Sequence, residues 1–341
     1  MVIKIRIKNL IIFFLIAAIL MSSLIYYNSN SLYNSVYAAS STEKKFIKYV
    51  EFNVPYTLMD AAMKYDIKSH DTDKPLNWIE LIAYLAAKYG GNFSKYKSKH
   101  LDELVQKLKD GATMEELTKN MKYYSYYLEA YTAVLGGFLG EFEIEVPVKD
   151  APDQKEWVKK YGLIAFSPIA KDFYYTHYDD FGDARSYGFK RKHLGNDLIG
   201  QVGIPIIAVE GGVVEALGWN KYGGWRIGIR SHDKKRYYYY AHLRKNFPYN
   251  KDLKVGSVVK AGDVIGYMGR TGYSDVENTN NLTTPHLHFG MQLIFDESQK
   301  ESNNEIWINV YNIVRLLSRN KSKTVKDMET KEHRRVYDIK Y

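Results

Sequence analysis

The chain has 341 residues, of which 45% are hydrophobic and 26% charged, so it is long enough for two modest domains and apolar enough to bury a core. It contains no cysteine, which excludes disulfides, thiolate metal sites and cysteine nucleophiles, so any metal must be held by His, Asp or Glu. The formal net charge of +9 predicts attraction to polyanions, which include nucleic acid, anionic wall polymers and lipid surfaces.

The N-terminus has the pattern of an export signal. Lys4, Arg6 and Lys8 precede an apolar run from Leu10 to Ile25, and such a pattern places the rest of the chain outside the cytoplasm. We expect residues 1–40 to be a retained signal anchor, or a signal peptide if the small-x-small sequence at 36–38 is cleaved. Export argues against a nucleic-acid partner, for which the chain also has no recognition motif.

Residues 42–145 are predicted to form a helical domain. Pro75 precedes the first strongly periodic stretch and Gly90-Gly91 ends it. The apolar residues that recur at helical spacing are Leu81, Ile82, Leu85 and Ala86, then Leu101, Leu104, Val105 and Leu108. His70 and His100 are isolated among lysines and aspartates, and we interpret both as ordinary surface histidines. This region therefore contains no predicted catalytic group.

Residues 146–318 change character to short β-type runs separated by glycine-containing turns. The runs are 204–209, 213–217, 225–230, 237–243, 264–268 and 287–293. This spacing predicts a mostly antiparallel β-sheet domain, and the chain as a whole is then α+β. Residues 305–317 are predicted to be one amphipathic C-terminal helix. Residues 319–341 are a basic tail, predicted to be solvated and partly disordered, with adhesion to anionic wall polymer as the functional alternative.

Four of the nine histidines fall in three short motifs of this β region. His193 and Asp197 occur in His-Leu-Gly-Asn-Asp, His242 ends an aromatic strand, and His286 and His288 occur in Pro-His-Leu-His-Phe. Residues two apart on a strand share a face, so the last pair points to one side. A spacing of four likewise puts the first pair on one side of either a strand or a helix.

Each motif alone also has an ordinary structural interpretation. His193 and Asp197 can form a plain hydrogen bond, and His242 can be a satisfied core histidine. Zinc catalysis requires three protein ligands, an open position for water, a proton acceptor and a group that stabilises the oxyanion. The five side chains together match that requirement. By alternation Tyr238 and Tyr240 share the face of His242, and we expect them to line the groove with the polar loop 275–284.

The order of these motifs resembles the LytM/lysostaphin-type M23 metallopeptidases. Gly262-Asp263-Val264-Ile265-Gly266 and Gly269-Arg270-Thr271-Gly272 lie between them and are also typical of that family. The resemblance covers about residues 188–293. It implies that zinc (Zn2+) is bound by His193, Asp197 and His288, and that His242 and His286 are catalytic.

Within that family the chain is similar to the sporulation-associated LytH type, through residues 235–244 and 285–295. This similarity implies an endopeptidase that hydrolyses peptidoglycan stem peptides at L-Ala–D-Glu, with a role in spore cortex maturation. We expect a protein that is anchored in the membrane or secreted to the cell wall, and we infer no obligate protein partner. Two alternatives stay open: an M23 peptidase that cuts cross-links, and a non-catalytic wall-binding or scaffold protein.

Overall fold

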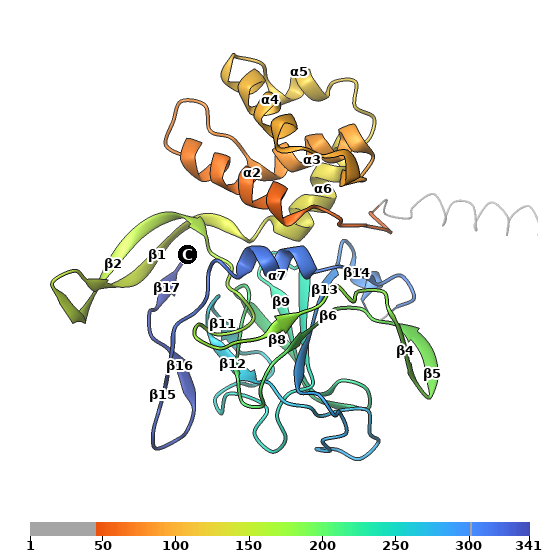
Figure 1. Ribbon diagram of the computed structural model, residues 1–341, viewed down its shortest axis with the longest axis vertical. Helices are drawn as coiled ribbons and strands as arrows, with labels where there is room; N and C mark the ends of the chain where they lie inside the picture. The colour runs from red at the N-terminus through yellow and green to blue at the C-terminus, as the bar shows by residue number, and fades with distance from the viewer. Residues whose placement is uncertain (1–45, 301) are drawn as a thin grey trace, which may run out of the picture. The chain divides into compact units, whose positions relative to one another are not determined.

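The computed structural model describes residues 46–300 and 302–341 (Figure 1). The predicted export signal in residues 1–40 lies outside the described residues. Within the described ranges, no helix combines the length and apolar character needed to cross a membrane.

The helices lie largely in the N-terminal part, as predicted. They are α2 (Tyr56–Ser69), α3 (Trp78–Tyr89), α4 (Ser98–Lys109), α5 (Met114–Thr118) and α6 (Tyr124–Leu135). Asn77 begins α3 by accepting hydrogen bonds from the backbone N–H groups of Ile79 and Glu80. Gly90 ends it in the left-handed conformation, at φ 61°, where glycine carries no steric penalty. Leu81 and Leu85 are fully buried, which confirms the apolar face expected from their spacing.

A small sheet follows the helices and includes the end of the chain. Its strand order is β17-β1-β2, formed by β17 (Ile339–Lys340), β1 (Leu139–Val148) and β2 (Ala151–Leu163). The basic end is therefore not the disordered tail that we predicted, because β15 (Thr324–Lys326), β16 (His333–Arg335) and β17 all pair. Ile339 is buried against a small apolar cluster, and the Arg335 Nε lies 3.2 Å from Asp263 Oδ1. The basic composition of residues 319–341 does not by itself indicate these strand pairings and contacts.

The main sheet is antiparallel throughout, as predicted, and its strand order is β11-β8-β9-β10-β13-β6-β3. Its strands are β11 (Val258–Val259), β8 (Gly212–Asn220), β9 (Gly224–Ser231), β10 (Arg236–Ala241), β13 (His286–Leu293), β6 (Asn196–Ile199) and β3 (Thr176–His177). A separate pair consists of β7 (Pro205–Ile207) and β12 (Val264–Tyr267), and a hairpin of β4 (Ala184–Tyr187) and β5 (Phe189–Lys192). Strand β13 lies between β10 and β6, so it meets two of the sequence motifs at once.

The prediction of one helix over residues 305–317 is wrong in its first part. Ile306–Ile308 is a strand, β14, which pairs with β13, and the C-terminal helix α7 begins only at Tyr311 and ends at Leu317. Ile306 and Ile308 are both buried while Trp307 between them is less so, which is the two-residue period of a strand. Three residues were too few for this period to stand out beside the helical pattern that follows.

A buried arginine joins the helices to the β region. Arg236 is fully buried, and its Nη1 donates a hydrogen bond of 2.6 Å to the carbonyl oxygen of Ala133 on α6. Its Nε lies 2.8 Å from Glu210 and its Nη2 lies 2.7 Å from Asp233. A buried charge is tolerated only when it is paired and hydrogen-bonded, so this network links the packing of α6 to strand β10.

Candidate metal centre

The register of β13 brings two motifs face to face. His288 lies opposite Asp197 on β6 and opposite Ala241 on β10. Directly opposed residues project from the same face of a sheet, so the His288 ring and the Asp197 carboxylate meet. Leu287 is fully buried on the other face, and His286 lines the same cavity as His288.

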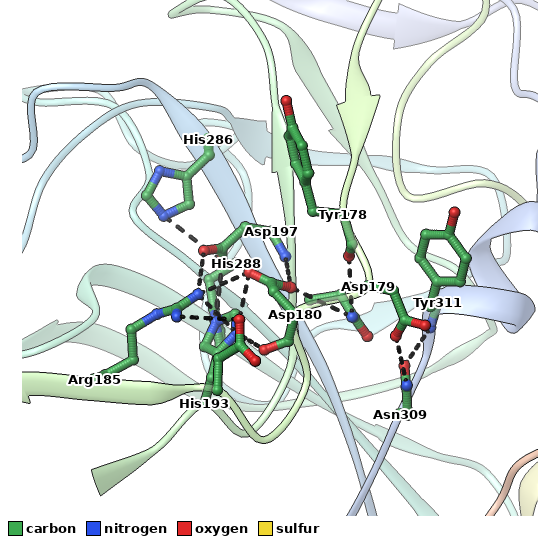
Figure 2. Close-up of polar contacts among 12 residues, drawn as sticks. Tyr178, Asp179, Asp180, Arg185, His193, Asp197, His286, His288, Asn309 and Tyr311 are labelled. Atoms are coloured by element: carbon green, nitrogen blue, oxygen red, sulfur yellow. Dashed lines mark hydrogen bonds and ion pairs between the residues drawn. The ribbon is translucent and has the colours of Figure 1, made fainter. Parts of the chain in front are cut away.

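His193 completes this group from the loop that precedes β6 (Figure 2). Its Nε2 lies 2.8 Å from His288 Nδ1 and 3.1 Å from Asp197 Oδ1, and the latter two atoms are 3.4 Å apart. Three ligand atoms around a tetrahedral zinc ion are separated by roughly 3.3 Å. The Asp197 Oδ1 is buried and has no hydrogen-bond partner among the described residues. A buried carboxylate oxygen beside two imidazole nitrogens fits a bound metal cation.

The hydrogen bond of His193 selects the nitrogen that is offered to a metal. Its Nδ1 lies 3.0 Å from the carbonyl oxygen of Asp180, which can only accept, so Nδ1 carries a hydrogen. The Nε2 then faces His288 and Asp197. Burial lowers the pKa of His193, but the carboxylates of Asp180 and Asp197 outweigh burial and raise it to about 9. Binding of a metal at Nε2 therefore displaces a proton.

His242 and His286 lie side by side in the same cavity, with ring centroids 4.7 Å apart. The Nδ1 of His242 is 2.8 Å from the carbonyl oxygen of Thr271, and the Nδ1 of His286 is 2.9 Å from that of Thr284. Both rings therefore carry hydrogen on Nδ1, which leaves Nε2 as the proton-accepting atom. Burial lowers the pKa of His242 well below its usual value, so this ring is neutral at neutral pH.

The tyrosines that we expected to line the groove do not line it. Tyr238 and Tyr240 are fully buried on the opposite face, where the Tyr238 hydroxyl donates to Glu210 and the Tyr240 hydroxyl accepts from the backbone of Val209. Strand β10 ends at Ala241 and His242 adopts a left-handed φ of 63°, so alternation does not extend to it. Tyr239 lines the cavity instead, and of the loop 275–284 only Leu282 does.

Two residues near the centre carry no motif and were not predicted. Asp180 accepts a hydrogen bond of 3.2 Å from the backbone N–H of Asp197 and lies 3.3 Å from His193 Nδ1. Arg185 on β4 places its Nη2 2.8 Å from Asp180 Oδ2 and 3.4 Å from Asp197 Oδ2 (Figure 2). Together they orient His193 and Asp197 from outside. The neighbouring Asp179 does not belong to this group, because its Oδ1 instead accepts a hydrogen bond of 2.8 Å from Asn309 Nδ2.

The cavity has a volume of about 390 Å³ and is open to a substrate. Its lining combines the five histidine and aspartate side chains with the tyrosines 222, 239 and 273. Three basic side chains, Arg185, Arg191 and Lys192, lie on the hairpin that forms one wall. Aromatic and basic groups around a polar centre are suited to a peptide that carries negative charge.

Comparison with known proteins finds a family model that matches the part of the chain that carries this centre. Residues 191–303 match Peptidase family M23, and all five motif residues lie inside that range. An L-Ala--D-Glu endopeptidase from Bacillus subtilis (strain 168) is 43% identical over 124 residues, which are 36% of this chain and 36% of that protein. Lysostaphin from Staphylococcus simulans is 42% identical over 98 residues, 28% of this chain and 17% of that protein. The chain thus spans about a third or less of the length of these relatives.

A solved structure shares the fold over more of the chain. A crystal structure described as a candidate glycyl-glycine endopeptidase, lytM from Ruminococcus gnavus, matches with a TM-score of 0.51 and 24% sequence identity. The match covers 82% of this chain and 94% of that one. The common fold therefore extends beyond the part of the chain that matches the family.

Proposed function

From the Peptidase family M23 domain that residues 191–303 form, we propose that the protein is a zinc endopeptidase that hydrolyses peptidoglycan stem peptides outside the cytoplasm. One observation carries the proposal. The ligand atoms of His193, Asp197 and His288 lie within 4.8 Å of one another, and His242 and His286 line the same cavity. Three ligands with two further histidines beside them make a hydrolytic centre and not a closed structural metal site.

Zinc is proposed because of the donor set. Two imidazole nitrogens and one carboxylate oxygen, with no cysteine in the chain, match catalytic zinc sites that keep a fourth position open. When bound there, zinc supplies an activated water molecule and polarises the scissile carbonyl. Asp180 and Arg185 hold His193 and Asp197 in the orientation that this requires.

His242 and His286 are proposed as the catalytic residues. The carbonyl oxygens of Thr271 and Thr284 hold their Nδ1–H groups, so each ring offers Nε2 to the cavity in a defined orientation. A neutral ring accepts a proton at Nε2 from the attacking water, and a protonated ring donates a hydrogen bond to the oxyanion or to the leaving amine. Two adjacent histidines allow both functions within one catalytic cycle.

We propose L-Ala–D-Glu as the bond that is cut. Support comes from the Bacillus subtilis relative of that name, which is 43% identical over the aligned segment, and from the basic wall of the cavity. Action in spore cortex maturation, and attachment to the membrane or release to the wall through residues 1–40, are further parts of the proposal. Both rest on the sequence pattern and on the resemblance described above.

The experiment combines metal content with product analysis. The full-length protein is expected to contain about one zinc ion per chain and to release peptides from purified peptidoglycan. Mass spectrometry of the products should find new N-termini on D-Glu, with L-Ala left on the sugar-linked part. New termini at cross-links would instead support a cross-link hydrolase. Metal binding without any released peptide would support a non-catalytic wall-binding protein and contradict the proposal.

A further inference from the structure

Arg191 is held by two aromatic rings in the wall of the cavity. It lies on β5, and its guanidinium carbon is 4.9 Å from the ring centroid of Tyr222 and 5.1 Å from that of Tyr273. Its Nη2 also donates a hydrogen bond of 2.6 Å to the Tyr273 hydroxyl. Aromatic faces and one hydrogen bond orient the planar guanidinium without neutralising its charge.

No carboxylate of the described residues lies within 4.0 Å of Arg191, and its Nη1 is buried without a hydrogen-bond partner. Arg185 lies directly opposite it in the hairpin and is different, because Arg185 contacts Asp180 at 2.8 Å and Asp197 at 3.4 Å. Like charges directly opposite each other destabilise a strand pair. The hairpin thus keeps a second arginine in the cavity wall that has no carboxylate partner among the described residues.

The charge of the cavity favours an anion as that partner. Arg185, Arg191 and Lys192 line it, and Asp197 is the one carboxylate among its lining residues. A cleft with an excess of one charge concentrates ligands of the opposite charge. A guanidinium with an unpartnered N–H group binds a carboxylate better than a neutral group, because the hydrogen bond is then charge-assisted.

Tyr273 relates this arginine to the proposed catalytic histidine. Its ring lies 5.1 Å from the Arg191 guanidinium carbon and is stacked on the His242 ring, with centroids 5.8 Å apart and planes inclined by 23°. One aromatic ring therefore separates Arg191 from His242. A group bound by Arg191 belongs to a residue next to the scissile bond and not to a distant part of the substrate.

We propose that Arg191 is a specificity-determining residue that binds a free carboxylate on the substrate residue adjoining the scissile bond. The inference rests on the proposed function and selects among the bonds that such an enzyme cuts. A glutamate within a peptide uses one carboxyl group for the chain and keeps the other, whereas glycine has no side-chain carboxylate. Arg191 therefore favours a bond beside D-Glu over a glycine bridge.

The test is a binding measurement on the full-length protein after zinc removal by chelation, so that neither metal contact nor cleavage contributes. The first probe is an N-acetylated, C-terminally amidated peptide that contains L-Ala–D-Glu with the free carboxylate of that glutamate. The second is the same peptide with this carboxylate converted to a carboxamide. Calorimetric titration should give roughly tenfold tighter binding of the carboxylate peptide. Arg191→Gln should abolish that difference, and Arg191→Lys should keep part of it because the charge remains without the planar guanidinium.

Lys190→Gln is the matched control, because Lys190 is the exposed neighbour on the same strand and does not line the cavity. This variant removes one charge and should keep the tenfold preference. Equal binding of both peptides by the unaltered protein would overturn the inference. So would a retained preference in Arg191→Gln, or an equal loss for both peptides, which would indicate a structural role. Failure of the proposed function would appear separately, as zinc-loaded protein that releases no wall peptide while the binding preference stands.

Discussion

Asp180→Asn is expected to weaken zinc binding although Asp180 is not one of the three proposed ligands. Its Oδ2 lies 2.8 Å from Arg185 Nη2 and 3.3 Å from His193 Nδ1, and its Oδ1 accepts from the backbone of Asp197. The substitution keeps the shape of the side chain but removes its charge. Arg185, which is already 3.4 Å from Asp197 Oδ2, then has that ligand as its principal partner and competes with the metal for it.

The size of the effect follows from the contacts that remain. The carbonyl oxygen of residue 180 still accepts from His193 Nδ1 at 3.0 Å, so the orientation of that ring survives. Loss of a group that orients a metal ligand costs 10- to 100-fold in affinity as a rule, and we expect about tenfold here, or about 1.4 kcal/mol. Asp180→Ala also removes the acceptor for the Asp197 N–H and should approach about 100-fold.

A competition titration against a chromophoric zinc chelator measures this affinity directly. Asp179→Asn is the control, because Asp179 is adjacent and equally charged but bonds to Asn309 at 2.8 Å, away from the centre. It should leave zinc affinity within about twofold of the unaltered protein. Unchanged affinity in Asp180→Asn, or an equal decrease in both variants, would refute the reasoning that Asp180 acts by orienting the ligands.

Three further predictions follow from the same structure. Chelation should abolish release of peptide from peptidoglycan and added zinc should restore it, which a dye-release assay on labelled wall can follow; activity that survives chelation would contradict the metal centre. His288→Ala should lose both bound zinc and activity. His242→Ala should keep about one zinc per chain by elemental analysis, while its rate of hydrolysis falls at least about 100-fold. Loss of zinc from His242→Ala would instead assign His242 a ligand role. Arg236→Ala should lower the free energy of unfolding, measured in urea, by about 3–5 kcal/mol, because Glu210 and Asp233 are left without their cation. The control Lys235→Ala, at the exposed neighbouring residue, should change this free energy by less than about 0.5 kcal/mol. Similar effects of both substitutions would argue against the buried network.

The wrong predictions have specific local causes. Alternation along β10 put Tyr238 and Tyr240 on the face of His242, but the left-handed backbone at His242 ends the strand before that residue. Ile306 and Ile308 continued an apolar pattern that also suits a helix, and only their pairing with β13 makes them a strand. At β10 a single local change of backbone conformation, which one sequence does not reveal, reversed which side chains face the core. At residues 306–308 it changed the type of element, while Ile306 and Ile308 are buried.

The residues that the sequence did not point to are those whose importance depends on distant contacts. Asp180, Arg185 and Arg191 belong to no spaced pair of metal-ligating residues, and each resembles an ordinary surface charge. Arg191 acquires its setting from Tyr273, which is 82 positions away in the chain. Such partners are brought together by loop and hairpin geometry, which composition and periodicity do not encode.

The sequence by itself determined the α+β order of elements, the antiparallel character of the sheet and the shared face of His286 and His288, because helical and strand periods are short-range properties of the backbone. Only the tertiary structure decided that His193 and Asp197 meet His288, since that depends on the pairing of β6 with β13 across some ninety residues of chain. It alone also decided that Arg185 is neutralised by aspartates while Arg191, directly opposite it, keeps its charge in the cavity.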